Sequence, residues 1–191
     1  MRALALLLVL ACAVSIPVAR AVPSDLLVVS PEPAAAPWWR RAKWAPRSTR
    51  VQGVAIKRLH PDWCAAEAFS RDLLSEALLE LQPSGSFDGY VFLVEGSFDG
   101  RGKPQIAFVG AYRRCSGEQG LYFAIVEPQR ERPRMRFLVE VPEPGSAIAT
   151  IGREPDGTLA VWWCDQCDNG VRVEYSRETL GFFVAGPATR R

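Results

Sequence analysis

The feature that most constrains the fold is a run of eight short apolar segments in the second half of the chain. Each has the length of a β-strand, and turn-forming stretches such as DGRGKP, CSGEQG and DNG separate them. This spacing predicts a mostly antiparallel meander, arranged as a sandwich, a curled sheet or a partial propeller. The segments are YVFLVEG at 90–96, PQIAFVGAY at 104–112, GLYFAIVE at 120–127, MRFLVEV at 135–141, AIATIG at 147–152, TLAVWW at 158–163, VRVEYS at 171–176 and LGFFVAG at 180–186.

The residue pattern within the segments predicts how each one is covered. YVFLV and LYFAIV are continuously apolar, as expected of strands that are buried on both faces. VRVEY and MRFLVEV alternate apolar and polar residues, as expected of strands with one face in water. The earlier segment VQGVAIKRL, at 51–59, is expected to add a ninth strand.

One amphipathic helix is predicted over residues 62–82, packed on a face of the sheet. Asp62 is a suitable N-cap, and Pro83-Ser84-Gly85 ends the helical pattern. The apolar stripe comprises Phe69, Leu73, Leu74, Ala77, Leu78 and Leu81.

The N-terminus predicts export. A positive Arg2, an apolar run too short to span a bilayer and the small residues Ala19 and Ala21 form a signal-peptide pattern over residues 1–21. We expect cleavage after Ala21 and a periplasmic or secreted protein. Lipidation at Cys12, which follows VLA, is the alternative.

Residues 22–50 are predicted to be a proline-rich, basic and aromatic tether, followed by a single β-rich domain over residues 51–191. Within the tether, tryptophans alternate with cations. One hypothesis is a surface patch that contacts anionic envelope components, and the other is that tryptophan rings dock onto the domain and fix the arm. The residues are Trp38, Trp39, Arg40, Arg41 and Trp44.

The net charge of +2 conceals an uneven distribution. Residues 22–61 carry a net charge of +5 and residues 62–191 a net charge of −5. The basic arm can therefore lie against its own acidic domain. A nucleic-acid-binding domain is not indicated.

Four cysteines remain after removal of the signal peptide, and an even number in an exported chain favours disulfides. We favour pairing of Cys64 with Cys115 and of Cys164 with Cys167. The second pair fits if residues 164–167 form the turn itself. If the strand instead continues to Cys167, these two cysteines must pair with the other two.

The pair Cys164 and Cys167 also has two functional interpretations. WWCDQC resembles the WC-x-x-C motif of thioredoxins, but a turn and a strand follow it where that family has a helix. A zinc site would need Cys64 and Cys115 as further ligands. These possibilities support an alternative function as an envelope thiol-disulfide or metal-handling protein.

GSFDGRGKPQIAFVG, residues 96–110, resembles the FG-GAP/VCBS repeat, in which an acidic, glycine-rich calcium loop leads into a short strand. The resemblance implies a blade-like β architecture. Ser97, Arg101 and Gln105 stand where that family has acidic ligands, which leaves Asp99 alone. Since calcium needs six or more oxygen ligands, no calcium is expected here.

The chain shows no familiar catalytic set. Its single histidine, His60, precedes Pro61 in a turn, and no phosphate-binding glycine loop is present. We therefore expect a non-enzymatic binding protein of the bacterial cell envelope, without cofactor or metal, that binds a protein partner. A specific version is a periplasmic inhibitor or immunity protein against a wall-degrading enzyme, by analogy with small β-rich lysozyme inhibitors. The candidate binding-loop residues are Ser84, Ser86, Asp88, Tyr90, Ser116, Glu118 and Tyr122.

Overall fold

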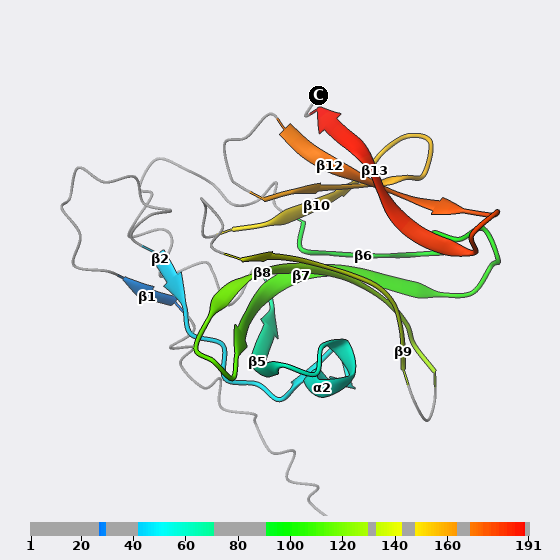
Figure 1. Ribbon diagram of the computed structural model, residues 1–191. Coiled ribbons are helices and arrows are strands. Elements are labelled where there is room, and N and C mark those ends of the chain that lie inside the picture. The colour runs from blue at the N-terminus through cyan, green and yellow to red at the C-terminus, as the bar shows by residue number, and fades with distance from the viewer. Residues whose placement is uncertain are drawn as a thin grey trace, which may run out of the picture.

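The chain folds into antiparallel β-sheets (Figure 1). The computed structural model describes residues 27–29, 42–70, 91–129, 133–142, 148–163 and 169–189. These residues form a five-stranded sheet, a four-stranded sheet and two small two-stranded sheets. One short helix is present among them, and none of their helices is long and apolar enough to cross a membrane. The prediction of a mostly antiparallel β-fold is confirmed, and the described strands form neither a closed barrel nor a propeller.

The five-stranded sheet is built around a long central hairpin. Its order is β5-β7-β8-β9, and β6 pairs with the same edge of β7 as β5 does. Ala68 lies opposite Gly110 and Leu93 opposite Phe108, so β5 and β6 occupy successive parts of that edge. The strands are β5 (Trp63–Ala68), β6 (Leu93–Gly96), β7 (Gln105–Arg114), β8 (Gln119–Glu127) and β9 (Arg134–Pro142).

The four-stranded sheet is a meander in which each strand pairs with the next. The backbone N–H of Ile151 donates to the carbonyl of Val91 at 2.8 Å, which joins this sheet to the approach to β6. Its last strand contains a bulge, because Arg172 pairs with Gly186 while Val173 pairs with Val184. The strands are β10 (Thr150–Arg153), β11 (Leu159–Trp162), β12 (Asn169–Ser176) and β13 (Gly181–Thr189).

The segment before the larger sheet is not the single strand predicted for residues 51–59. Gln52 and Gly53 have φ angles of 47° and 76°, so the chain reverses there in a tight hairpin turn. The elements of this region are β1 (Leu27–Val29), which pairs with β2 (Ala42–Trp44), β3 (Arg50–Val51), which pairs with β4 (Val54–Ala55), and the helix α2 (Ile56–Leu59).

The helix predicted over 62–82 is wrong in its first part, because residues 63–68 form β5. The Trp63 ring stacks on Tyr112 with centroids 4.9 Å apart, and Cys64 is bonded to Cys115. These long-range contacts hold the segment against β7 and outweigh its local helical preference. Residues 71–82 lie outside the described part of the chain.

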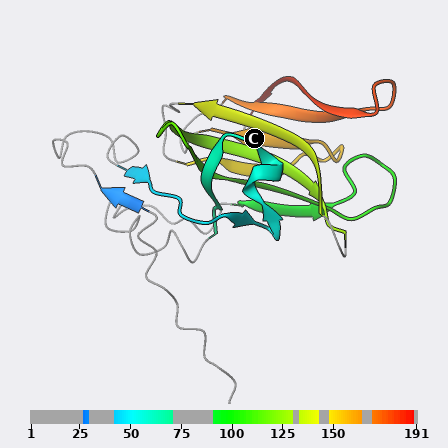
Figure 2. The same ribbon diagram turned by 60° about the horizontal axis from the view of Figure 1, so that its bottom comes forward.

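The central hairpin β7–β8 is covered on both faces, so the molecule has three layers. Figures 1 and 2 show β10–β13 over one face of the larger sheet and α2 on the other. The core between the two large sheets includes Val109, Leu121, Phe123, Ile151 and Val161. The core on the opposite face includes Ile56, Leu59, Trp63, Phe108 and Tyr122. This double coverage explains the continuously apolar sequence of β8, whose residues 120–127 are all buried.

Two glycine–tyrosine pairs hold the central hairpin in register. Gly110 lies opposite Tyr122, and Tyr112 lies opposite Gly120. A Cβ atom at Gly110 would lie 2.7 Å from the Tyr122 hydroxyl, and one at Gly120 would lie 2.7 Å from the Tyr112 hydroxyl. Each tyrosine therefore lies across the glycine of the partner strand, and a slip in register would place a side chain where a ring now lies.

The Cys64–Cys115 disulfide favoured by the sequence is present in the structure. It joins β5 to the β7–β8 turn, with its two Cα atoms 4.9 Å apart and a sequence separation of 51 residues. Both cysteines are exposed at the surface. Cys164 and Cys167 lie outside the described residues, so their pairing stays a prediction.

Replacing Gly110 with alanine is expected to lower the free energy of unfolding by about 1–3 kcal/mol, because the new methyl group would overlap the Glu67 carbonyl and the Tyr122 ring. Urea denaturation measures the change. Gly181→Ala is the matched control, since its Cβ would meet nothing closer than 3.9 Å. Equal midpoints for the two variants would contradict this interpretation.

Removing the disulfide with Cys64→Ser/Cys115→Ser is expected to cost about 4 kcal/mol, because the bond closes a long loop in the unfolded chain. The short Cys164–Cys167 loop should contribute only about 2 kcal/mol if that bond forms. Urea denaturation under oxidising conditions compares this variant with Cys164→Ser/Cys167→Ser. A Cys64/Cys115 variant as stable as the parent chain would rule out a structural role for this bond.

Candidate functional site

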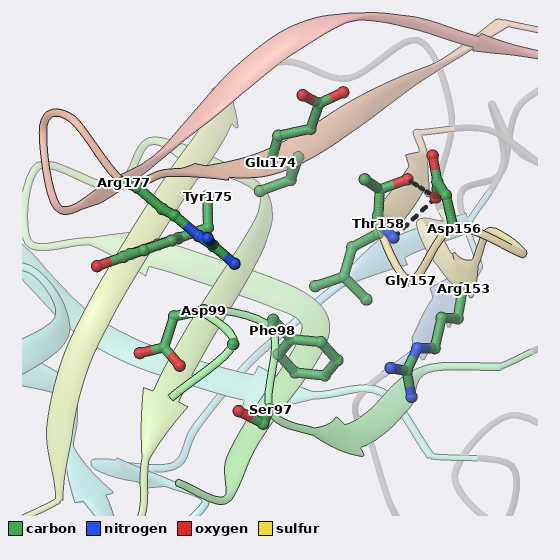
Figure 3. A pocket seen from close by; sticks show the side chains of 13 residues that line it. Ser97, Phe98, Asp99, Arg153, Asp156, Gly157, Thr158, Glu174, Tyr175 and Arg177 are labelled. Atoms are coloured by element: carbon green, nitrogen blue, oxygen red, sulfur yellow. Dashed lines mark hydrogen bonds between the residues drawn. The ribbon is translucent and has the colours of Figure 1, made fainter. Parts of the chain in front are cut away.

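A pocket of about 330 Å³ opens where three connections meet at one end of the two large sheets. They are the β6–β7 loop, the β10–β11 turn and the β12–β13 turn, which lie at the same end in Figures 1 and 2. Two buried side chains, Leu159 and Val173, line it together with more polar residues. Figure 3 shows the residues around the pocket, including Phe98, Asp99, Arg153, Asp156, Glu174, Tyr175 and Arg177.

The β6–β7 loop is closed by its own hydrogen bonds. The Gly102 N–H donates to Ser97 Oγ at 2.9 Å, and the Arg101 N–H donates to Asp99 Oδ1 at 3.0 Å. The Phe98 N–H donates to Gln105 Oε1 at 2.8 Å. The positions compared with calcium ligands thus bond to the loop itself, which fixes Phe98 and Asp99 at the pocket.

The β10–β11 turn is organised by Asp156. Its Oδ1 accepts the Thr158 N–H at 3.0 Å and the Thr158 hydroxyl at 2.6 Å, while its Oδ2 accepts from Arg172 Nη2 at 2.8 Å. The hydrogen bonds from Thr158, supported by the Arg172 charge, lower the pKa of Asp156 below its ordinary value. The carboxylate is therefore ionised near neutral pH and tied to its own turn.

Arg136, on β9, links the pocket acid Asp99 to Glu127 at the end of β8. Arg136 Nη1 donates to Glu127 Oε2 at 3.0 Å, and its Nη2 lies 3.7 Å from Asp99 Oδ2. Burial alone would raise the pKa of Glu127, but the hydrogen bond from Gln129 and the charges of Lys103 and Arg136 outweigh it and lower the pKa. The side chain of Asp99 is fully buried, and its Oδ2 has no hydrogen-bond donor within the described structure.

The charges around the pocket do not all cancel. Each of the three acids has an arginine partner within 4.0 Å: Arg101 and Arg136 for Asp99, and Arg172 for both Asp156 and Glu174. Arg153 and Arg177, by contrast, form no ion pair with any described residue. The Arg153 guanidinium lies over the Phe98 ring, 5.9 Å from its centroid. The pocket thus presents two cations without carboxylate partners in the described part of the chain.

The predicted binding-loop residues do not form this pocket. Ser116 and Glu118 are exposed in the β7–β8 turn, at the opposite end of β7 from the β6–β7 loop. Tyr122 lies on β8 and is completely buried in the core, so its ring cannot contact a partner. The prediction that it belongs to a binding loop is wrong. Ser84, Ser86, Asp88 and Tyr90 lie outside the described residues.

The predicted surface patch is corrected at Trp44. This residue is buried, and its ring packs against Phe69 with centroids 4.6 Å apart. Nearby, the Ala66 N–H donates to the Ser48 carbonyl at 3.0 Å. The alternative, that a tryptophan docks onto the domain, holds for Trp44. Trp38, Trp39, Arg40 and Arg41 lie outside the described part of the chain.

The single histidine belongs to a separate cluster beside the disulfide. His60 Nε2 lies 3.6 Å from Glu140 Oε2, and the same carboxylate accepts from Trp63 Nε1 and from Arg114 Nη2. Because Cys64 and Cys115 are bonded to each other, they are not available as zinc ligands. Among the described residues, no group of three or more His, Cys, Asp or Glu side chains is placed to hold a metal ion.

Sequence reasoning missed the residues that line the pocket. Arg153 is the last residue of β10, and Arg177 is the first residue after β12. The sequence does not show which turns meet at the pocket, because this depends on how the two sheets stack. The nearest sequence signal is an arginine beside each of two turns, β10–β11 and β12–β13.

Replacing Glu127 with glutamine is expected to lower the free energy of unfolding by roughly 1–3 kcal/mol near neutral pH, because Arg136 loses its closest carboxylate. The pKa of Glu127 in the folded protein lies below its ordinary value, so this stabilisation is fully present above that ordinary value and is lost as the pH falls through the folded pKa. Urea denaturation at about pH 7 and about pH 3 should show the parent–variant difference shrinking in acid. The exposed Glu118→Gln is the control, and a difference of equal size at both pH values would contradict the assignment.

Comparisons of the chain with protein-family models, with curated proteins and with solved structures find no match. The resemblance of residues 96–110 to the FG-GAP/VCBS repeat therefore stays a prediction. The functional argument rests on the geometry of the pocket and its rim.

Proposed function

We propose that this chain is an exported binding protein of the bacterial cell envelope, without catalytic activity, and that the pocket with its surrounding turns is the binding site. The observation that carries the proposal is the convergence of three connections from two sheets on one pocket, in which two arginines have no carboxylate partner among the described residues. Binding sites commonly lie on loops that a rigid scaffold positions. The signal-peptide pattern of residues 1–21 and the Cys64–Cys115 disulfide support export.

The chemistry of the pocket favours binding over catalysis. A general acid must hold a proton near the working pH, but the lowered pKa of Asp156 keeps that carboxylate ionised. Asp99 and Glu174 each have an arginine neighbour within 4.0 Å. His60, the only histidine in the chain, pairs with Glu140 in the cluster beside the disulfide.

Exposed apolar side chains on the β12–β13 hairpin, here called the rim, favour a protein partner. Leu180 is 61% exposed in the turn, and Phe183 and Val184, which are consecutive and so point to opposite faces of the strand, are 42% and 45% exposed on β13. Large apolar side chains that are exposed in this way are available for contact with a partner. Leu180 also has a φ angle of 54°, which is unfavourable for a leucine. We propose that a wall-degrading enzyme, which this chain would inhibit, is the partner that binds the rim.

Affinity capture from envelope extract tests the proposal, with residues 22–191 as bait and mass spectrometry of the retained proteins. Leu180→Asn/Phe183→Thr should lose the retained partner, because both apolar side chains are removed. Asparagine tolerates a positive φ and threonine suits a strand, so the variant is expected to fold. Arg58→Asp, on the exposed surface of α2, is the control and should retain the partner. A partner retained equally by all baits would place binding elsewhere.

The inhibitor version has its own measurement. The mature protein is added to lysozyme and to an envelope amidase, and hydrolysis of cell wall is followed. Inhibition would be supported if the parent protein stops hydrolysis and the rim variant does not. Full enzyme activity in the presence of the protein would contradict the inhibitor version. The capture experiment would then decide whether the protein binds another envelope partner.

A further inference from the structure

We propose that the pocket binds an acidic sugar, meaning a single polyhydroxylated ring that carries a carboxylate or a phosphate, with Arg153 and Arg177 holding the anionic group. This inference rests on the proposed function as a binding protein and specifies what its pocket accepts.

The first step is the charge that remains after internal pairing. Asp99, Asp156 and Glu174 are compensated by Arg101, Arg136 and Arg172, none of which is among the pocket-lining residues. Arg153 and Arg177 do line the pocket and have no carboxylate partner among the described residues. Their sequence neighbours Glu154 and Glu178 form no ion pair with them either. Two guanidinium groups without a carboxylate partner among the described residues favour an oxyanion, because each can donate two parallel hydrogen bonds to it.

The second step is how the two arginines are placed. Both come from the four-stranded sheet and reach toward the β6–β7 connection of the other sheet. A Cβ atom at Gly96 would lie 3.5 Å from Arg153 Nη1, and one at Gly100 would lie 3.9 Å from Arg177 Nη2. Figure 3 shows the two side chains approaching the pocket from different sides. A ligand that contacts these two arginines would therefore lie against the β6–β7 connection of the other sheet.

The third step is the remainder of the lining, which suits a ring with hydroxyl groups. Leu159, Val173 and Phe98 provide apolar surface, and Glu174, Ser97 and Thr158 provide oxygen atoms. Carboxylate oxygens accept hydrogen bonds from hydroxyl groups, and a serine or threonine hydroxyl can donate or accept. A volume of about 330 Å³ is at the lower end of the range for ligand pockets, which suits one ring better than a long chain.

Isothermal titration calorimetry at low ionic strength tests the inference with four probes: glucuronate, glucose 6-phosphate, glucose and inorganic phosphate. The two acidic sugars should bind at least about tenfold more tightly than glucose, because only they use the guanidinium groups. They should also bind more tightly than phosphate alone, and added salt should weaken their binding. Comparison of glucuronate with glucose 6-phosphate decides between carboxylate and phosphate.

Variants connect the binding to the two arginines. Arg153→Gln and Arg177→Gln should each weaken binding of the preferred acidic sugar by about tenfold. Arg58→Gln, which removes an exposed arginine on α2, is the matched control and should leave it unchanged. Circular dichroism confirms that the variants are folded.

Several results would overturn the inference. They are glucose binding as tightly as the acidic sugars, phosphate alone binding as tightly as glucose 6-phosphate, acidic-sugar binding that survives both substitutions, and no binding of any probe. None of these affects the envelope capture experiment, in which the rim variant is compared with the parent chain. A partner captured through the rim, with no acidic sugar bound, would refute this inference and leave the proposed function intact.

Discussion

The structure depends on the burial of one hairpin, β7–β8, on both of its faces. A one-residue slip in register would move each side chain to the opposite face of the sheet. Because both faces of this hairpin are buried, any such slip is unfavourable, and the register must be unique. The reciprocal pairs Gly110–Tyr122 and Tyr112–Gly120 meet this requirement, since each ring occupies the space that a Cβ on the facing glycine would need. The Trp63 ring stacks on the same tyrosine layer, 4.9 Å from the Tyr112 centroid, and so brings β5 into the sheet.

The same hairpin links the core to the pocket. β7 begins directly after the β6–β7 loop, and β8 ends at Glu127, whose carboxylate binds Arg136. Arg136 in turn lies beside Asp99, the buried acid of the loop. The β6–β7 loop at the pocket is therefore positioned by ion pairs that are anchored at the end of the buried hairpin. Arg153 and Arg177 come from the other sheet, so the pocket exists only when the two sheets are stacked.

The strands from residue 90 onward could be predicted from the sequence, but the pocket could not. All eight apolar segments from residue 90 onward contain a strand, because alternation and turn residues are local signals. Residues 63–68 form a strand instead of the predicted helix because distant partners, Tyr112 and Cys115, decide their conformation. The sequence does not predict the hairpin at Gln52-Gly53, because this pair is a weaker turn signal than Asn-Gly or Asp-Gly. Arg153 and Arg177 are 24 positions apart in the sequence, and no periodic pattern relates them.

The bulge in β13 has a consequence for the solubility of the protein. Gly181–Thr189 lies at the edge of its sheet and contains no charged residue, so it lacks the lysines that often prevent edge strands from joining other molecules. Instead, Ala185 is left without a cross-strand partner, and Pro187 offers no N–H to an approaching strand. Self-association is thus opposed by an irregular main chain instead of by electrostatic repulsion. Salt screens electrostatic repulsion but would leave this irregularity largely unaffected.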